Sequence, residues 1–409
     1  MPSQSTTFIA MTNNRTHYRP DNNAPVSGSW LKPILFLGCL LFSAIPVISL
    51  AATASNKPAV IENPVPEKPL ISAEQKQQIA SLLQAARADV KAVRLTSPRG
   101  RNALEKYRQV LKLQPENNKA LQGIRQIAMK YFILAASAWP KSPAKTDGYI
   151  EAAQTLVPGI QLPEKLANKL SFSDKLGKDK NGKDILAPEM IRLPPGVLVI
   201  PVIGQPDRVV TLPSFAISRR EVSRNQWFEF ARATQQEMPS CFKQVSSKLP
   251  ITCISQAEAM AYANWLSKKT GEVYRLPSES EWIYAASAGI HQKFWWGDKF
   301  KTGLAVCNGC KVPATDRHPA VAGHLKYNQF GIFNMPGNVR EWTNDCWHNQ
   351  LDRLPEDGKP WNFRCEMTMT VVRGGSWQTA PATTRQLYRS LAVPTSKQAD
   401  IGIRLVQVL

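Results

Sequence analysis

Cysteine is the residue type whose number and spacing carry most chemical information in this sequence. Six of the seven cysteines fall in its C-terminal part, at positions 241, 253, 307, 310, 346 and 365. An even number of cysteines in an exported domain favours disulfides over free thiols or a metal site. Neighbouring cysteines make the simplest pairs, Cys241 with Cys253 and Cys346 with Cys365, although other connectivities remain open.

Residues 307–310 read Cys-Asn-Gly-Cys, a CxxC spacing that occurs in haem-attachment and zinc-binding segments. A c-type haem site would need histidine where Lys311 stands. A zinc site of this kind would need a second CxxC, which the sequence lacks. We therefore interpret the pair as a small disulfide staple in a loop.

The other reactive residue types form no familiar catalytic motif. The histidines, among them His17, His291, His318 and His348, make neither an HxxxH-type pair nor a clustered facial triad for iron. The sequence also has no glycine-rich phosphate loop and no GxSxG elbow. Several classes of metal-dependent, phosphoryl-transfer and hydrolytic enzyme are thereby excluded.

An uncharged apolar stretch at residues 33–54 is long enough to cross a bilayer core of roughly 30 Å as a helix. Arg15, Arg19 and Lys32 precede it, so the positive-inside rule places residues 1–32 in the cytoplasm and the rest of the chain outside. The small residues at 52–54 favour a cleaved signal peptide. The length of the span and of its leader favours a retained anchor, and both alternatives stay open.

Export changes the interpretation of the charge. The chain of 409 residues has a net charge of +20, which in a cytosolic protein would suggest nucleic acid. Outside the cytoplasm, anionic lipid head groups or an acidic protein surface are the expected counterparts. We therefore expect a periplasmic protein associated with the inner membrane and no nucleic-acid partner.

The elements that would position the cysteines divide into four segments. Residues 55–72 carry four prolines and predict an extended tether. Apolar residues recur at helical spacing through 73–165, which predicts an all-α domain whose first helix is capped by Ser72. Residues 166–189 are polar and predict a linker. At 190–409 the content of Trp, Gly and Pro rises, and helical periodicity is limited to 258–266 and 279–288.

In the helical part, Ala103, Tyr107 and Pro115 lie at the spacing of the small residue, aromatic residue and terminal proline of a tetratricopeptide repeat. The segment resembles that family, whose stacked helix pairs commonly hold another protein's helix or peptide. A plain helical spacer is the alternative.

From residue 190 onward a series of segments resembles the formylglycine-generating enzyme family, also called sulfatase-modifying factor domains. In order, the segments are MIRLPPGVLVIPVIG, ISRREVSRNQWFEF, AMAYANWLSKKTGEVYRLPSESEWIYAASAG, FWWGD, FGIFNMPGNVREWTNDCW, VVRGGSW and IGIRLVQVL. The resemblance implies an α+β architecture, an irregular relative of the C-type lectin fold. Within 258–266 we expect Ala261, Trp265 and Leu266 to face the core, and within 279–288 Trp282 and Ala285.

The resemblance also implies one metal site. In the family, the segment that here reads Asn334-Met335-Pro336-Gly337-Asn338-Val339-Arg340-Glu341 wraps a calcium ion. The resemblance implies that Asn334 and Glu341 supply side-chain oxygens and that Gly337 and Val339 supply backbone carbonyls. A hard cation requires such oxygen ligands. The alternative is that Glu341 only caps or pairs with an arginine. Val306 stands where the family's second calcium site has Asn, so we expect one structural calcium.

Active members of the family carry two cysteines after a GGS-aromatic turn, which hold copper(I) and bind the substrate cysteine that is oxidised to formylglycine. Counting from residues 374–377, these positions are Thr379 and Thr384. A threonine hydroxyl is a hard ligand with too high a pKa to ionise and forms no disulfide. We therefore expect no catalytic residue, no copper and no oxidase, unless Cys307 and Cys310 substitute from another loop.

The scaffold without its reactive cysteines favours a non-catalytic periplasmic binding or regulatory protein with a protein partner in the cell envelope. Bacterial relatives of this type include an outer regulator of type VI secretion that acts on a transmembrane kinase. The former substrate groove near Trp377 and Arg373 would hold a protein segment. One alternative is a formylglycine-generating oxidase acting on a cysteine of a sulfatase-like substrate. Another is a lectin-like domain that binds envelope glycans.

Overall fold

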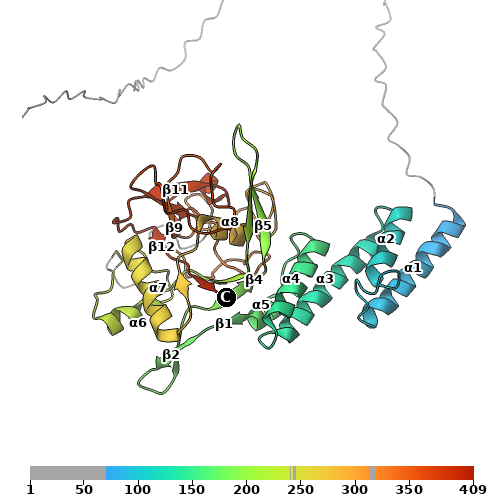
Figure 1. Ribbon diagram of the computed structural model, residues 1–409, viewed down its shortest axis with the longest axis horizontal. Coiled ribbons are helices and arrows are strands. Elements are labelled where there is room, and N and C mark those ends of the chain that lie inside the picture. Colours follow the sequence, from blue (N-terminus) through green and yellow to red (C-terminus); the bar gives the residue numbers. More distant parts are fainter. Residues whose placement is uncertain (1–70, 240, 243–245, 313–317) are drawn as a thin grey trace, which may run out of the picture. The chain divides into compact units, whose positions relative to one another are not determined.

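The computed structural model describes residues 71–239, 241–242, 246–312 and 318–409 (Figure 1). The expected leader and membrane segment lie outside these residues, as does nearly all of the expected tether. Within the described ranges, no helix is both long enough and apolar enough to cross a bilayer.

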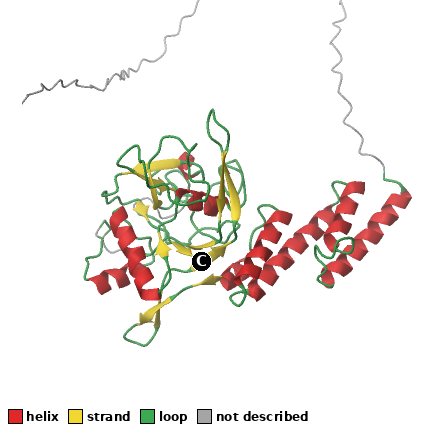
Figure 2. Ribbon diagram, in the orientation of Figure 1, coloured by secondary structure: helices red, strands yellow, loops and turns green. Residues whose placement is uncertain are grey.

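The N-terminal part of the described chain is helical (Figures 1 and 2). The helices are α1 (Ala73–Lys91), α2 (Ala103–Leu113), α3 (Asn118–Ala138), α4 (Pro143–Leu156) and α5 (Glu164–Leu170). Helix α1 packs on α2, α2 on α3 and α3 on α4, whereas α5 packs on α3. Ser72 caps α1 as predicted, in a reciprocal capping box with Gln75. A Cβ on Gly123 would lie 2.1 Å from the ring of Tyr107, so this glycine permits the close approach of α3 to α2. Similarity to tetratricopeptide repeats stays a prediction.

Residues 166–189, expected to be a linker, are ordered into secondary structure. They contain most of α5, then β1 (Ser171–Phe172) and a hairpin of β2 (Lys175–Lys178) and β3 (Asp184–Leu186). The linker prediction is wrong here because β1 pairs with β4 (Met190–Leu193) at the edge of a sheet, where polar residues can face solvent.

The C-terminal part is built from two sheets and two separate hairpins with much irregular chain between them (Figure 2). The larger sheet has the order β1-β4-β7-β13-β8, with β7 at Phe215–Ser218, β8 at Tyr274–Arg275 and β13 at Val406–Val408. The smaller has the order β11-β10-β9-β12, with β9 at Arg340–Cys346, β10 at Thr370–Arg373, β11 at Arg389–Ala392 and β12 at Ile401–Gly402. The second hairpin joins β5 (Gly196–Ile200) to β6 (Arg208–Leu212).

Three helices pack around these sheets: α6 (Arg224–Thr234), α7 (Gln256–Thr270) and α8 (Glu279–Ser287). Gly271 ends α7 with a φ of +82°, a conformation that favours glycine. Leu266 is buried in α7, as predicted, whereas Ala261 is exposed and its neighbours Tyr262 and Ala263 are buried instead. Every residue of α8 is buried, including Trp282 and Ala285.

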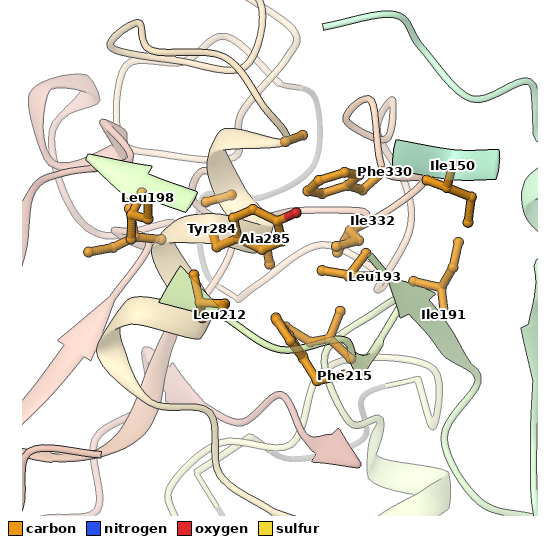
Figure 3. Close-up of a cluster of buried hydrophobic side chains, with 14 of the residues drawn as sticks. Ile150, Ile191, Leu193, Leu198, Leu212, Phe215, Tyr284, Ala285, Phe330 and Ile332 are labelled. Atoms are coloured by element: carbon orange, nitrogen blue, oxygen red, sulfur yellow. The ribbon is translucent and has the colours of Figure 1, made fainter. Parts of the chain in front are cut away.

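The helical part and the C-terminal part share one hydrophobic core. Side chains from α3 and α4, Phe132 and Ile150 among them, belong to the same buried cluster as Ile191 and Leu193 of β4. Figure 3 shows Ile150 beside Ile191 in this cluster. An ion pair between Arg192 and Asp147, with Nη2 to Oδ2 at 2.6 Å, reinforces the contact. The helices are therefore anchored to the larger sheet.

The six cysteines of the C-terminal part form three disulfides between sequence neighbours. They are Cys241–Cys253, Cys307–Cys310 and Cys346–Cys365. The prediction of disulfides and of neighbouring pairs is confirmed.

Candidate functional site

The GGSW segment makes a tight turn directly after β10, and its two glycines are required by their surroundings. Gly374 and Gly375 have φ angles of +104° and +71°. A Cβ on Gly374 would lie 3.2 Å from both Met335 O and the Trp282 ring, and one on Gly375 would lie 2.8 Å from Thr383 Oγ1. The turn is followed by a short 3₁₀ helix, η1 (Pro381–Thr384). This helix ends at Thr384, the second position at which the family resemblance expects a cysteine.

Thr379 and Thr384 use their hydroxyl groups to hold this turn. Thr379 Oγ1 accepts a hydrogen bond from Ser376 N–H at 2.8 Å and lies 2.7 Å from Thr383 Oγ1. Thr384 is buried, and its Oγ1 donates to Pro381 O at 2.8 Å. Both side chains therefore have a local structural role, and neither offers a soft ligand or an ionisable group.

A hollow of about 540 Å³ lies beside the turn, between Trp377 and the Cys307–Cys310 loop. The described residues that line it are Cys307, Asn308, Gly309, Lys311, Val312, Trp377 and Gln378. Asn308 N–H donates to Thr379 O at 2.9 Å, which ties the disulfide loop to the turn. The indole N–H of Trp377 is buried without a hydrogen-bond partner in the described part of the chain.

Arg373, expected near this groove, is completely buried on the other side of the turn and does not line the hollow. Its guanidinium pairs with Glu279 at 2.5 Å, and Arg389 pairs with the same carboxylate at 2.7 Å. Burial opposes ionisation of Glu279, but the two arginines hold its pKa below the ordinary value. Arg373 is therefore part of an internal charge cluster. Glu279 likewise lies in a buried structural helix.

Asp345 is a second buried carboxyl group in that region. Its oxygens accept the backbone N–H groups of Glu279 at 2.8 Å and Trp361 at 2.9 Å. Burial, together with the negative charge of Glu279, raises the pKa of Asp345 to about 7. Asp345 was missed at the level of sequence because the N–H groups that donate to it and the charges around it come from residues distant in the chain.

The four residues of the expected calcium loop lie in one tight segment before and within β9. Asn334 and Gly337 have left-handed backbone, with φ of +55° and +83°. Asn334 Oδ1 is buried and has no hydrogen-bond partner among the described residues. An unpartnered buried oxygen next to carboxylates suits a hard cation, so this donor set fits calcium.

The Glu341 carboxylate already has two partners within the protein. It accepts the indole N–H of Trp282 at 2.6 Å and pairs with Arg404 at 2.9 Å. All three side chains are fully buried. The arginine pairing considered as the alternative for Glu341 is thus present, and it leaves the Asn334 oxygen still unpartnered.

Glu221 completes this buried polar group, and no sequence motif pointed to it. Its carboxylate accepts from Asn338 Nδ2 at 2.8 Å and from Asn334 Nδ2 at 3.3 Å. Burial raises the pKa of Glu221 to about 7, opposed by Arg404 and reinforced by Glu341. A cation held near Asn334 would therefore also neutralise this carboxylate.

A second and larger hollow, of about 730 Å³, lies between the β5–β6 hairpin and the chain that follows Thr384. Its walls combine apolar residues such as Leu198, Ile283 and Tyr388 with the polar residues His291 and Gln386. None of the predicted site residues lines it.

Comparison with known proteins places these features in a wider group. A family model described as a sulfatase-modifying factor enzyme 1-like domain matches residues 177–409. The solved structure of PvdO from Pseudomonas aeruginosa is 28% identical, covers 58% of this chain and 98% of PvdO, and aligns with a TM-score of 0.51. Residues 177–409 contain the smaller sheet, the larger sheet except β1, the GGSW turn and the asparagine–glutamate loop.

Two curated relatives differ in how much of them the chain covers. Chaperone protein LppX of Paenibacillus barcinonensis is 24% identical over 277 residues, 56% of this chain and 92% of LppX. The formylglycine-generating enzyme of Mus musculus is 29% identical over 178 residues, 39% of this chain and 44% of the mouse protein. The chain thus spans under half the length of the mouse enzyme.

Proposed function

The chain belongs to the family of sulfatase-modifying factor enzyme 1-like domains, and from that membership we propose that it is a non-catalytic binding or regulatory protein of the cell envelope. One observation carries the proposal. Thr379 and Thr384 stand at the two positions where the resemblance to formylglycine-generating enzymes implies catalytic cysteines. A hydroxyl group can neither hold copper(I) nor exchange with a substrate thiol.

The surroundings of the two threonines support this reading. Their hydroxyls are held within the turn, and the six cysteines of the described residues are joined in disulfides. The glycines, the buried charges and the asparagine–glutamate loop all remain. A chain that keeps the scaffold but has threonine in place of the reactive pair is suited to hold a partner without converting a cysteine of it to formylglycine.

The partner that we propose is a protein segment in the periplasm, contacted through the hollow beside Trp377. The hollow offers the apolar ring of Trp377 together with the positive charge of Lys311. The chaperone name of LppX supports a role in contacting other proteins. The tetratricopeptide-like helices would supply a second contact. By analogy with family relatives, the pathway is envelope signalling or secretion, type VI secretion among them.

We also propose one structural calcium ion, held by the side chains of Asn334 and Glu341 and the carbonyls of Gly337 and Val339. The unpartnered Asn334 oxygen supports it. When bound, the ion would supply positive charge to a buried carboxylate pair. Trp282 and Arg404 would orient Glu341.

The alternative is a formylglycine-generating oxidase, the activity named for the mouse relative. In this chain it would require Cys307 and Cys310 to leave their disulfide and bind copper in place of the missing thiols. Copper-dependent oxidation of a cysteine peptide separates the two functions.

A crosslinking and affinity-capture experiment tests the binding proposal. The full chain with a C-terminal tag is expressed in its host, crosslinked in the envelope fraction and recovered with and without calcium. We expect one envelope protein to be captured by the native chain and lost with Trp377→Ala. The exposed aromatic substitution Phe363→Ala, which lines none of the described hollows, should retain it. Failure to enrich any envelope protein over an untagged control would contradict the proposal.

A further inference from the structure

The Cys307–Cys310 disulfide differs from the other two in the length of chain that it closes. Its sequence separation is 3, against 12 for Cys241–Cys253 and 19 for Cys346–Cys365. A disulfide restrains the unfolded chain less as its loop shortens. Of the three disulfides, Cys307–Cys310 is therefore expected to stabilise the folded state least. Stability alone does not account for its position beside the hollow.

The two sulfur atoms of this disulfide have different environments. Cys310 is completely buried, in a cluster with Ala305 and Val306. Cys307 is 6% exposed and lines the hollow beside Trp377, whereas Cys310 does not. A thiol that enters the hollow therefore meets Cys307 Sγ first. This asymmetry gives thiol–disulfide exchange a direction, with Cys307 attacked and Cys310 released.

The charge of the hollow favours an incoming thiolate. Lys311 lines it, and none of its described lining residues is a carboxylate. The hollow beside Cys241–Cys253 provides a contrast, because Glu237 and Glu258 line it together with Lys397. Since the thiolate is the reactive species, the Lys311 side attracts it and the Glu237 side repels it.

Trp377 and the disulfide loop form two walls of the hollow. The Trp377 indole N–H is buried and has no hydrogen-bond partner in the described chain, so the ring meets the hollow as an apolar surface. The indole ring adds an apolar wall. Asn308 N–H to Thr379 O fixes the distance between this wall and the disulfide loop. A cysteine in an extended segment would thus be oriented toward Cys307.

We propose that the Cys307–Cys310 disulfide is a thiol–disulfide exchange centre for a cysteine-containing polypeptide. The partner thiolate forms a bond to Cys307 Sγ, the Cys307–Cys310 bond breaks, and Cys310 leaves as a thiolate that takes up a proton. A second thiol of the partner then attacks the partner's own sulfur, closes a disulfide there and releases Cys307. Two electrons pass from the partner to this chain. The proposal goes beyond the proposed function, which needs only non-covalent binding.

Selective reduction tests the proposal on the folded full chain. The protein is equilibrated in glutathione buffers of graded ratio, free thiols are alkylated, and each cysteine is quantified by mass spectrometry. We expect Cys307 and Cys310 to become alkylated at a reduced-glutathione concentration at least tenfold lower than the other four cysteines. If all three disulfides open together, or this one opens last, the proposal is overturned.

Trapping tests which sulfur reacts. Full-chain Cys310→Ser leaves Cys307 at the hollow, and Cys307→Ser leaves Cys310 buried. With oxidised glutathione as probe, we expect the Cys310→Ser variant to form a mixed disulfide at least tenfold faster. Circular dichroism and melting temperature establish that both variants are folded. Equal rates in two folded variants would overturn the proposal.

The charge of Lys311 gives a third readout that does not depend on removing a cysteine. In the Cys310→Ser background, Lys311→Glu should slow mixed-disulfide formation several-fold, whereas Lys311→Arg should leave it unchanged. A rate that is the same in both variants would contradict the role assigned to the hollow.

Discussion

At the scale of the residue, the buried charges show which side chains the fold depends on. Arg373 and Arg389 converge on Glu279 from strands of the smaller sheet, and the Arg373 and Glu279 side chains are essentially without solvent contact. A buried charge that loses its partner keeps its desolvation penalty. The cluster therefore stabilises the fold only as a unit, which a substitution can test.

Glu279→Gln should lower the free energy of unfolding by about 3–5 kcal/mol, because it leaves Arg373 buried without its counter-ion. The matched control is Glu356→Gln. Glu356 pairs with Arg208, but its side chain is 73% exposed. The control should change stability by about 0–1 kcal/mol. Chemical denaturation measures both, and equal losses would contradict the argument from burial.

Asp345 should give the stability of the protein a recognisable pH dependence. Its pKa in the folded chain is raised from 3.8 to about 7, so between these values the folded state holds a proton that the unfolded state has released. Its contribution to stability therefore falls as the pH rises from about 4 to about 7, by at most about 1.4 kcal/mol per pH unit.

The difference in unfolding free energy between the native chain and Asp345→Asn isolates this group, because the other titrating groups are common to both. Relative to the variant, the native chain should lose stability as the pH rises through this window. Parallel stability profiles would show that Asp345 does not titrate as described.

Calcium removal tests the oxygen site at Asn334. Excess EDTA should lower the melting temperature of the native chain by several degrees, and added calcium should restore it, because an ion bound only to the folded state stabilises it by mass action. Asn334→Ala should melt at the same temperature with and without calcium. Magnesium serves as the ion control, since it rarely accepts such an irregular set of ligands. A native melting temperature that is indifferent to chelator would contradict the site.

At the scale of the residue, the sequence predicted features that depend on residues close together in the chain or on the number of residues between motif positions. The neighbouring disulfides and the Gly271 helix end follow from short spacing. The placing of Thr379 and Thr384 at the family's cysteine positions stays a prediction from counting. Glu221, Asp345 and the Arg373–Glu279 pair were missed or misplaced. Arg373 and Glu279 are 94 residues apart, so only the tertiary fold brings them together.

At the scale of the element, the spacing of apolar residues predicted where helices occur. It was less accurate about which helix face is buried and about strands made of polar residues. Ala261 was expected to face the core, but Tyr262 and Ala263 are the buried residues of α7. The ring of Tyr262 stacks on Trp227, which places this side of the helix toward the core. The β2–β3 hairpin is rich in lysine and glycine and carries no apolar alternation. The hairpin forms a two-stranded sheet of its own and β2 contacts α7, which composition alone does not reveal.

The contact between α4 and β4 can be tested by substituting one residue of its ion pair. Arg192 and Asp147 side chains are only 9% and 11% exposed, and they join the helical part to the larger sheet. Asp147→Asn should cost about 2 kcal/mol, the scale of a charged hydrogen bond. It should also speed proteolysis between residues 157 and 163. Glu151→Gln, at an exposed position of the same helix, is the control and should leave both unchanged. A similar effect of both substitutions would contradict a specific ion-pair anchor.

At the scale of the whole molecule, the described part of the chain combines a helical region with a family domain through a common core. That domain carries the hollow beside Trp377 and the larger hollow beside the β5–β6 hairpin. The fold class could be predicted because the motifs occur in family order over a long stretch. The partner could not, since recognition depends on surface shape.

The central claim is that this scaffold has lost the oxidase chemistry of its family. The most direct measurement incubates the purified full chain with copper(I), oxygen and a cysteine peptide, and follows conversion of cysteine to formylglycine by mass spectrometry, beside an active formylglycine-generating enzyme. We predict no conversion above the protein-free control while the active enzyme turns over. Copper-dependent formation of formylglycine by this chain would contradict the account.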